Sequence, residues 1–271
     1  MKTQNSNPTA KLTPKKAIIL LLPVVFALVA ALAVALLVQG GLKPAEDPTP
    51  TLPPEESSTE PTNVEVMAPP ESEPREIYSL GLKFRSNSDG TAALVGIGSC
   101  TDREIKIPDT TPEGDLVTAI GSEAFMGIVT IGSVILPDSL MTIGENAFRE
   151  SGITSVNIGG AVISIGEGAF ADCQSLTAIN VSEANAMYAS KDGVLFNREM
   201  TEIICYPSGK ADRRYTIPST VNRIAPSAFS SAVNLKEIAF DGTEKEWKNV
   251  YVCSDNGSLH AAILSFTRSD K

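Results

Sequence analysis

The chain of 271 residues carries 32 acidic and 22 basic side chains, which gives a net charge of −10 at neutral pH. A protein that follows a nucleic-acid backbone needs a stripe of basic residues, and this acidic balance argues against that class of partner. The lysines that do cluster precede an apolar segment at the N-terminus, where they are interpreted as a topology signal: Lys2, Lys11, Lys15 and Lys16. We therefore predict no nucleic-acid partner.

The apolar segment covers residues 17–38 without a charged side chain. As a helix it would span about 33 Å, which matches a bilayer core of about 30 Å. A cleaved signal peptide is the alternative, because Ala31-Leu-Ala33 resembles a cleavage site, although it lies inside the apolar run. We interpret residues 17–38 as an uncleaved transmembrane signal-anchor. This predicts a single-pass protein of the cell membrane, with residues 1–16 as a cytoplasmic tail and the remainder extracellular.

Residues 39–76 are predicted to be a disordered acidic linker. They hold nine of the 18 prolines and nine carboxylates, against only Lys43 and Arg75 as basic residues. Such a segment buries too little apolar surface to order itself, and its prolines and charge repulsion keep it extended. We interpret it as a stalk.

A phrase that recurs four times dominates the rest of the chain. It follows the pattern Val/Leu-x-x-Ile-Gly-x-x-Ala-Phe, with Ala in place of Gly in the last copy, and the copies end at Phe125, Phe148, Phe170 and Phe229. The first two steps are 23 and 22 residues, and the last, of 59, is one unit plus an insertion. A fixed period in the twenties is typical of a solenoid.

Each unit predicts two short strands. After each Phe, apolar residues recur with a final x-Ile-x-Ile alternation, which is typical of a strand with one buried face. The Val/Leu-x-x-Ile piece is a second extended segment, and the Gly after it fits a sharp corner. We expect the Ala-Phe pair on one turn of helix, with the Phe side chains stacked into a ladder. The predicted fold is a β-rich repeat solenoid with short strands and a helical turn per coil, after one N-terminal transmembrane helix.

The solenoid is predicted to cover residues 117–253. Residues 77–116 are interpreted as its N-terminal cap, in which Asp89-Gly90 is a hairpin signal. Residues 182–214 are interpreted as an inserted hairpin, made of the β-like runs 191–196 and 201–206. Residues 254–271 are predicted to be a C-terminal tail.

The repeat resembles the BspA-like leucine-rich repeat family of bacterial surface proteins. The unit Ile165-Gly-Glu-Gly-Ala-Phe170-Ala-Asp-Cys173-Gln-Ser-Leu176 matches that pattern most fully, and phrases at 192–197, 205–209 and 240–247 also look like it. The resemblance covers about residues 78–253. It implies a leucine-rich-repeat solenoid exposed at the cell surface, with a role in adhesion or binding, and it supplies no catalytic residue.

The residues that could carry catalysis or bind metal form no recognisable set. His260 is the only histidine, near the C-terminus, and is interpreted as a surface residue. Two disulfides with three connectivities would fit the four cysteines, but we expect isolated buried thiols, and their spacing fits no metal motif: Cys100, Cys173, Cys205 and Cys253. Trp247 is expected to cap the last coil. The chain is predicted not to be an enzyme and to hold no cofactor or metal.

The function predicted is a membrane-anchored binding module for a protein or cell-surface ligand, acting in adhesion. The alternative is a structural or accessory envelope protein that contacts a partner membrane protein and has no soluble ligand. The candidate binding face consists of residues that vary between the buried positions of the strands: Ser133, Ser155, Asn157, Thr177, Ala178, Asn180, Lys236, Glu237 and Ala239.

Overall fold

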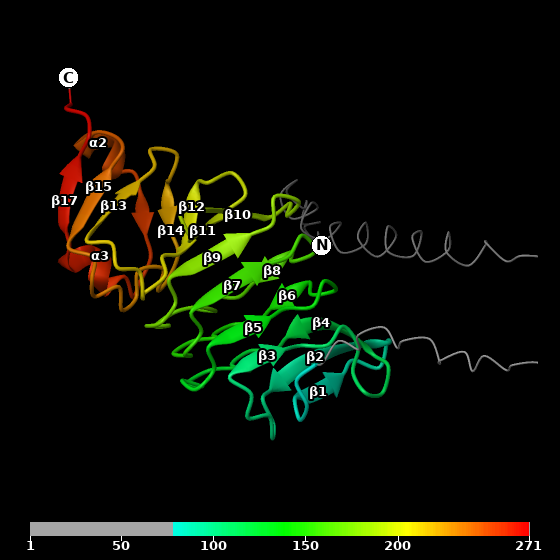
Figure 1. Cartoon of the computed structure of the whole chain (residues 1–271). Coiled ribbons are helices and arrows are strands. Elements are labelled where there is room, and N and C mark those ends of the chain that lie inside the picture. The colour runs from blue at the N-terminus through cyan, green and yellow to red at the C-terminus, as the bar shows by residue number, and fades with distance from the viewer. Residues whose placement is uncertain (1–77, 271) are drawn as a thin grey trace, which may run out of the picture. The chain divides into compact units, whose positions relative to one another are not determined.

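The computed structural model describes residues 78–270, so the predicted anchor and linker lie outside the described residues. Within 78–270, no helix is long and apolar enough to cross a bilayer. The chain winds through successive coils, and most coils contribute two short strands to parallel sheets (Figure 1).

Four sheets collect these strands. Sheet A contains β1 (Lys83–Ser86), β2 (Thr91–Gly96), β4 (Leu116–Ile120), β6 (Thr142–Ile143) and β8 (Ser164–Ile165). Sheet B contains β3 (Glu104–Lys106), β5 (Ser133–Ile135), β7 (Ser155–Ile158) and β9 (Ala178–Val181). Sheet C contains β10 (Tyr188–Lys191), β11 (Val194–Asn197), β12 (Glu202–Cys205), β14 (Arg223–Ile224) and β16 (Tyr251–Val252). Sheet D contains β13 (Arg214–Ile217), β15 (Glu237–Phe240) and β17 (Ile263–Phe266).

We number the coils by their strand pairs. Coil I is 116–135 (β4, β5), coil II is 142–158 (β6, β7) and coil III is 164–181 (β8, β9). Coil IV is 202–217 (β12, β13), and coil V is 223–240 (β14, β15). Before coil I, β1 and β2 pair antiparallel around the turn that contains Asp89 and Gly90.

The alternation read from the sequence sets which face of each strand is buried. In sheet B, Ile105 pairs with Val134 and Val156 pairs with Ile179, and all four are buried. Because side chains alternate across a strand, the residues between them face outward. The coils therefore stack with their apolar residues in register.

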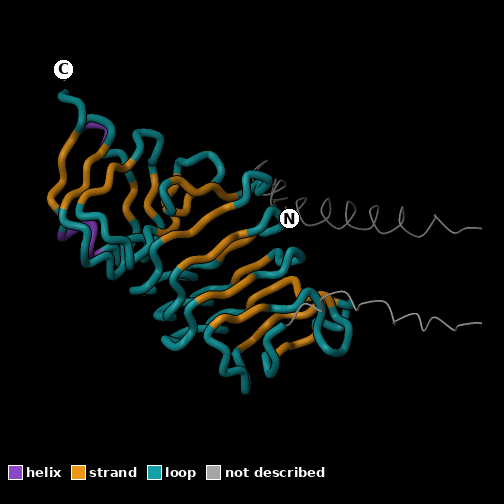
Figure 2. The backbone as a smooth tube through the Cα atoms, in the orientation of Figure 1, coloured by secondary structure: helices purple, strands orange, loops and turns teal. Residues whose placement is uncertain are grey.

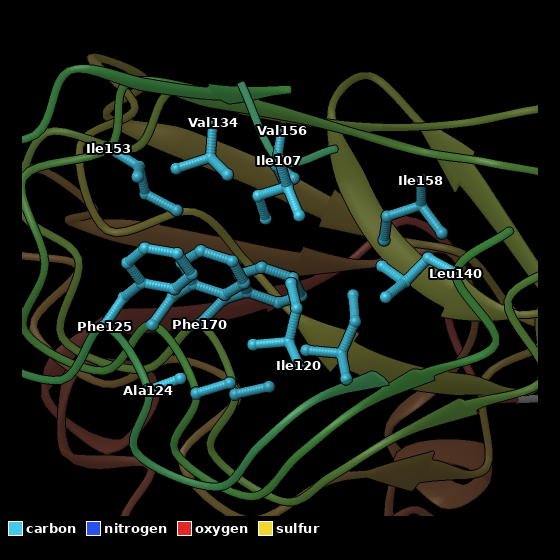
Figure 3. Close-up of a cluster of buried hydrophobic side chains, with 14 of the residues drawn as sticks. Ile107, Ile120, Ala124, Phe125, Val134, Leu140, Ile153, Val156, Ile158 and Phe170 are labelled. Atoms are coloured by element: carbon cyan, nitrogen blue, oxygen red, sulfur yellow. The ribbon is translucent and has the colours of Figure 1, made fainter. Parts of the chain in front are cut away.

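The predicted ladder of phenylalanines is confirmed. The rings of Phe125 and Phe148 stack with centroids 4.9 Å apart, and those of Phe148 and Phe170 lie 5.4 Å apart. All three rings are fully buried. Figure 3 shows Phe125 and Phe170 lying one behind the other in this stack. The regular spacing of the coils places each ring directly against its equivalent.

The expected helical turn around Ala-Phe is wrong. In each of the four Ala-Phe phrases the residue two positions before Phe has a positive φ, for example 59° at Glu123 and 52° at Asn146, which a right-handed helix does not allow. The segment around Ala-Phe, which we call the arc of the coil, instead consists of tight turns. Alternate N–H groups of the arc bond to the next coil, as from Phe125 N–H to Ala147 C=O at 2.7 Å. The two α-helices in the described range lie elsewhere: α2 (Glu244–Trp247) and α3 (Gly257–Ala261).

The insertion contributes three strands. β11 and β12 pair antiparallel, and β10 and β11 form a further hairpin at Asp192-Gly193, where both residues have positive φ. β12 then pairs parallel with β14, so it is also the first strand of coil IV. Sheets B and D are separate (Figure 2). The buried residues divide into two clusters, one centred on coils I–III and one on coils IV and V.

The predicted C-terminal tail is instead a further coil, coil VI (251–266). Its strands β16 and β17 pair parallel with β14 and β15 of coil V, and Leu259 of α3 is buried in the second cluster. This coil lacks the Ala-Phe phrase, so the repeat pattern did not reveal it. In α2, Trp247 packs against Phe240 at 5.3 Å. Because coil VI follows α2, Trp247 does not cap the last coil as expected.

Candidate binding surface

The outward face of sheet B is the candidate binding surface, and it gathers six of the residues predicted from the sequence. Ser133, Ser155 and Ala178 lie in register on neighbouring strands. Asn157 and Asn180 form a second row, and both are exposed. Thr177 precedes β9 and is exposed too. The side chains of coils I to III therefore form one polar surface over the strands seen side by side in Figure 1.

Hydrogen bonds between coils hold this surface in place. The Asn180 side-chain amide donates to Asn157 Oδ1 at 3.0 Å. Thr177 Oγ1 donates to Thr154 C=O at 3.1 Å, and Thr154 Oγ1 donates to Gly132 C=O at 3.0 Å. Each side chain is thus fixed by the coil before it, which lowers the entropy that a partner would lose from ordering it.

Several residues of this surface were not predicted from the sequence. Ile135 is 55% exposed at the place where the neighbouring coils carry asparagine, and it adds an apolar contact to a polar face. At the N-terminal edge, Glu104 is exposed, and Lys106 lies over the Tyr78 ring at 5.1 Å. The period-two alternation, extended from Ser133 to the next outward position, would have identified Ile135.

The remaining three candidates do not belong to this surface. Glu237 begins β15 in sheet D, beyond the insertion, and Lys236 directly precedes this strand. Glu237 pairs there with Arg214 at 3.7 Å. Ala239 is 1% exposed, because its methyl group lies between Thr216 and Ser265 of the two flanking strands. Including Ala239 in a binding face was wrong, and the expected continuous face is two separate sheets.

The cysteines are placed as packing residues. All four are free thiols, and three of them are buried: Cys100, Cys173 and Cys205. Cys173 Sγ donates to Phe148 C=O at 2.9 Å, and burial raises the pKa of this thiol. Burial also raises the pKa of the Cys205 thiol. A thiol held in its neutral form is a poor nucleophile and a poor metal ligand.

His260 lies exposed on α3, which belongs to coil VI and not to a tail. Within residues 78–270, no group of three or more histidine, cysteine or acidic side chains is close enough together to hold a metal ion. The outward face of sheet B offers polar and apolar contact area. Such a surface suits recognition of a macromolecule.

Comparison with protein families matches this chain to the BspA type leucine rich repeat region, in six copies over residues 99–212 and 205–254. A comparison with curated proteins gave no match. The matched range begins within the cap and ends in coil VI, so it covers the insertion as well as the regular coils.

Solved structures that are similar to this chain include leucine-rich repeat proteins of bacteria. The pneumococcal vaccine antigen PcpA is 24% identical, with a TM-score of 0.50, over 61% of this chain and 39% of its own. A leucine rich cell surface protein from Faecalibacterium prausnitzii is 18% identical over 66% and 72% of the two chains, with a TM-score of 0.41. A leucine-rich repeat protein from Eubacterium ventriosum is 19% identical over 69% and 70%, with a TM-score of 0.42.

This chain thus spans about two fifths of the PcpA chain that it matches. At these identities the likeness concerns the fold alone. The family model covers more than half of the chain, and its range contains coils I to V. The chain belongs to the BspA type leucine rich repeat family.

Proposed function

We propose that this protein is a membrane-anchored extracellular binding module, which recognises a protein or cell-surface ligand through the outward face of sheet B. The observation that carries the proposal is the pre-ordered polar surface over coils I to III, with Ile135 exposed within it. Solenoids bind partners through such repeated strand surfaces, because each coil presents equivalent positions with different side chains.

The anchor belongs to the same proposal. It rests on the apolar segment 17–38, the lysines before it and the acidic linker after it. A linker of this composition would hold the repeats away from the bilayer. The surface over four short strands is small and carries few charges, so one copy would bind weakly. Many copies on one membrane would raise the avidity without any new contact.

An adhesion assay tests the proposal. The full-length chain is displayed on a bacterial host, and adherent cells are counted on surfaces coated with mucin, with matrix proteins or with cell-wall material. We expect retention on at least one coating. Asn180→Arg should reduce that retention about tenfold, because an uncompensated cation on the face disturbs a close contact.

Ser219→Arg is the matched control, since Ser219 is exposed and lies outside sheet B. It should leave retention unchanged. No retention on any coating, or equal loss in both variants, would contradict the proposed face. Crosslinking in intact cells examines the structural alternative, which predicts one stoichiometric partner in the envelope.

A further inference from the structure

Coil IV is two residues shorter than its neighbour, and the missing residues lie at one place. Ile203 pairs in register with Ile224 of coil V. Tyr206 takes the place of the ladder phenylalanine and stacks on Phe229 at 5.2 Å. The step from Ile203 to Tyr206 is three residues, whereas the step from Ile224 to Phe229 is five. The chain is therefore short in the segment just before the aromatic residue.

A cleft of about 470 Å³ lies at this place. One wall is the arc of coil III (166–171), and the opposite wall is the arc of coil V (225–227). Ile204 and Cys205 of the shortened coil also line it, and the insertion contributes Tyr188 and Glu199. Its volume is in the range of pockets that bind small ligands or short peptide segments, about 300–1,000 Å³.

The coil III wall contains backbone N–H groups whose equivalents in the regular coils donate hydrogen bonds to the next coil. In coil II, the N–H groups of Asn146 and Phe148 donate to carbonyls of coil III at 3.0 and 2.8 Å. The equivalent N–H groups in coil III are those of Gly168 and Phe170. Neither has a hydrogen-bond partner among the described residues, and both residues line the cleft.

The coil V wall presents the complementary acceptor. Tyr206 N–H donates to Ala228 C=O at 2.8 Å, as the repeat requires, but Pro226 C=O has no partner within residues 78–270. The two missing residues would have supplied the acceptor for Gly168 N–H and the donor for Pro226 C=O, whereas the equivalent acceptor for Phe170 N–H is Cys205 C=O, which is present but does not bond to it. Next to the cleft, Asp172 N–H donates to Ser230 Oγ at 3.0 Å, so coils III and V bond directly across the shortened coil. This contact fixes the distance between the walls.

The charges around the cleft select the kind of occupant. Arg223 Nε donates to Glu202 Oε1 at 2.6 Å, which pairs the one guanidinium of the lining. Glu167 and Glu199 also line the cleft, and both are exposed without an ion-pair partner in the described structure. Backbone N–H groups alone would attract anions, but these carboxylates repel them. An uncharged backbone beside a cationic side chain fits both features.

We propose that this cleft binds an extended peptide segment of a partner protein, with a lysine or arginine side chain placed between Glu167 and Glu199. The peptide carbonyls accept from Gly168 and Phe170 N–H, and a peptide N–H donates to Pro226 C=O. The segment thus completes the ladder between coils III and V, as a strand added to an open edge does. This site goes beyond the proposed function, because it is not on the outward face of sheet B.

A titration with short peptides tests this site. The full-length chain in detergent is labelled with ¹⁵N-glycine and ¹⁵N-phenylalanine and titrated with acetyl-Ala-Lys-Ala-amide at millimolar concentration. We expect the amide protons of Gly168 and Phe170 to move downfield as they gain acceptors, while Gly144 and Phe148, which are already bonded, stay unchanged. Acetyl-Ala-Glu-Ala-amide should leave the amide resonances of all four residues unchanged.

Two variants sharpen the titration. The double substitution Glu167→Gln with Glu199→Gln should weaken the binding of the lysine peptide about fivefold, since exposed charge pairs contribute about 0.2–1 kcal/mol each. Glu113→Gln with Glu183→Gln, at exposed carboxylates away from the cleft, is the matched control and should have no effect. Insertion of Gly-Ser between Ile204 and Cys205 restores the coil length and should abolish the shifts.

Three results would overturn the proposal: unchanged Gly168 and Phe170 amides with the lysine peptide, equal shifts with the glutamate peptide, or equal weakening in the matched control. If the inserted variant does not fold, the glutamine pair still decides the question. A negative result here leaves the adhesion test of sheet B unaffected, because Asn180 does not line this cleft.

Discussion

Coils I to III and coils IV to VI differ in the contacts that hold neighbouring coils together. In the first group, three phenylalanine rings stack with interplanar angles of 6° and 9°, and one apolar cluster runs through the coils. In the second group the ladder contains Tyr206 and Phe229 and then ends. Asn256 of coil VI accepts from Phe229 N–H through Oδ1 at 2.8 Å and donates to Ala225 C=O at 3.0 Å.

The difference shows how a solenoid changes when its period changes. Equal coils pair backbone to backbone, so an apolar side chain suffices at every ladder position. Where a coil is short or is the last, backbone groups lose their partners, and polar side chains such as Asn256 and Ser230 supply them. In the shortened coil IV part of this demand stays unmet among the described residues, and the cleft lies there.

The largest loss of stability should follow from substitutions in the phenylalanine ladder of coils I to III. Phe148→Ala removes a ring that is stacked on both faces, whereas Phe170 is stacked on Phe148 alone among the described rings. We expect each substitution to cost about 3–5 kcal/mol of unfolding free energy, with Phe148→Ala the larger by about 1 kcal/mol. Urea unfolding of the full-length chain measures this. A Tm within a degree or two of wild type would mean that the ladder does not hold the coils together.

The corner glycines should matter next. A Cβ on Gly144 would lie against the backbone of coil I, 2.7 Å from Gly121 C, and backbone cannot move aside cheaply. We expect Gly144→Ala to cost about 1–3 kcal/mol. Coil V already carries Ala225 at this place, so Ala225→Gly should cost only about 1 kcal/mol. Equal melting of Gly144→Ala and wild type would show that the regular coils are less closely stacked than described.

Removing the Tyr206 hydroxyl should raise the stability of the protein, in contrast to the substitutions above. Tyr206 is 1% exposed, its hydroxyl has no partner in the described structure, and burial raises the pKa of this group. We expect Tyr206→Phe to stabilise the protein by about 1 kcal/mol, because a buried polar group without a hydrogen bond is costly. Phe148→Tyr should destabilise it. Loss of stability in Tyr206→Phe would reveal a partner for the hydroxyl.

The smallest effect is expected at the surface of sheet B. Asn157→Ala and Asn180→Ala each remove one exposed hydrogen bond, with a cost of about 0.5 kcal/mol. Because both substitutions break the same bond, the double variant should lose no more than either single one. Additive losses would mean that the two side chains act separately.

The sequence predicted the repeat, the buried faces and the ladder because each depends on local spacing. Ile-Gly-x-x-Ala-Phe recurs with nearly equal steps, so the register of Phe125, Phe148 and Phe170 follows from counting. The backbone conformation around Ala-Phe could not be predicted from this spacing. The positive φ at this position is shared by Glu123, Asn146 and Gly168. Asn and Gly adopt it readily but Glu does not, so the residues at this place gave no consistent local signal.

The candidate site was predicted only in part, for the same reason. Alternation placed Ser155 and Asn180 on the outward face, and their exposure agrees. Lys236 and Glu237 required knowledge of how the insertion separates sheets B and D, which depends on contacts between distant segments. The cleft depends on the alignment of Ile203 with Ile224, and that register became visible only once the strands were paired.

Amide hydrogen exchange in the full-length chain tests the interrupted ladder most directly. Asn146 and Gly168 occupy equivalent places in coils II and III, but only Asn146 N–H has an acceptor, at 3.0 Å, in the described structure. We predict that Asn146 is protected as strongly as its neighbours, whereas Gly168 exchanges at least about tenfold faster, because exchange there needs no hydrogen bond to open. Equal protection of the two amides would contradict the account, since the ladder would then continue through coil IV.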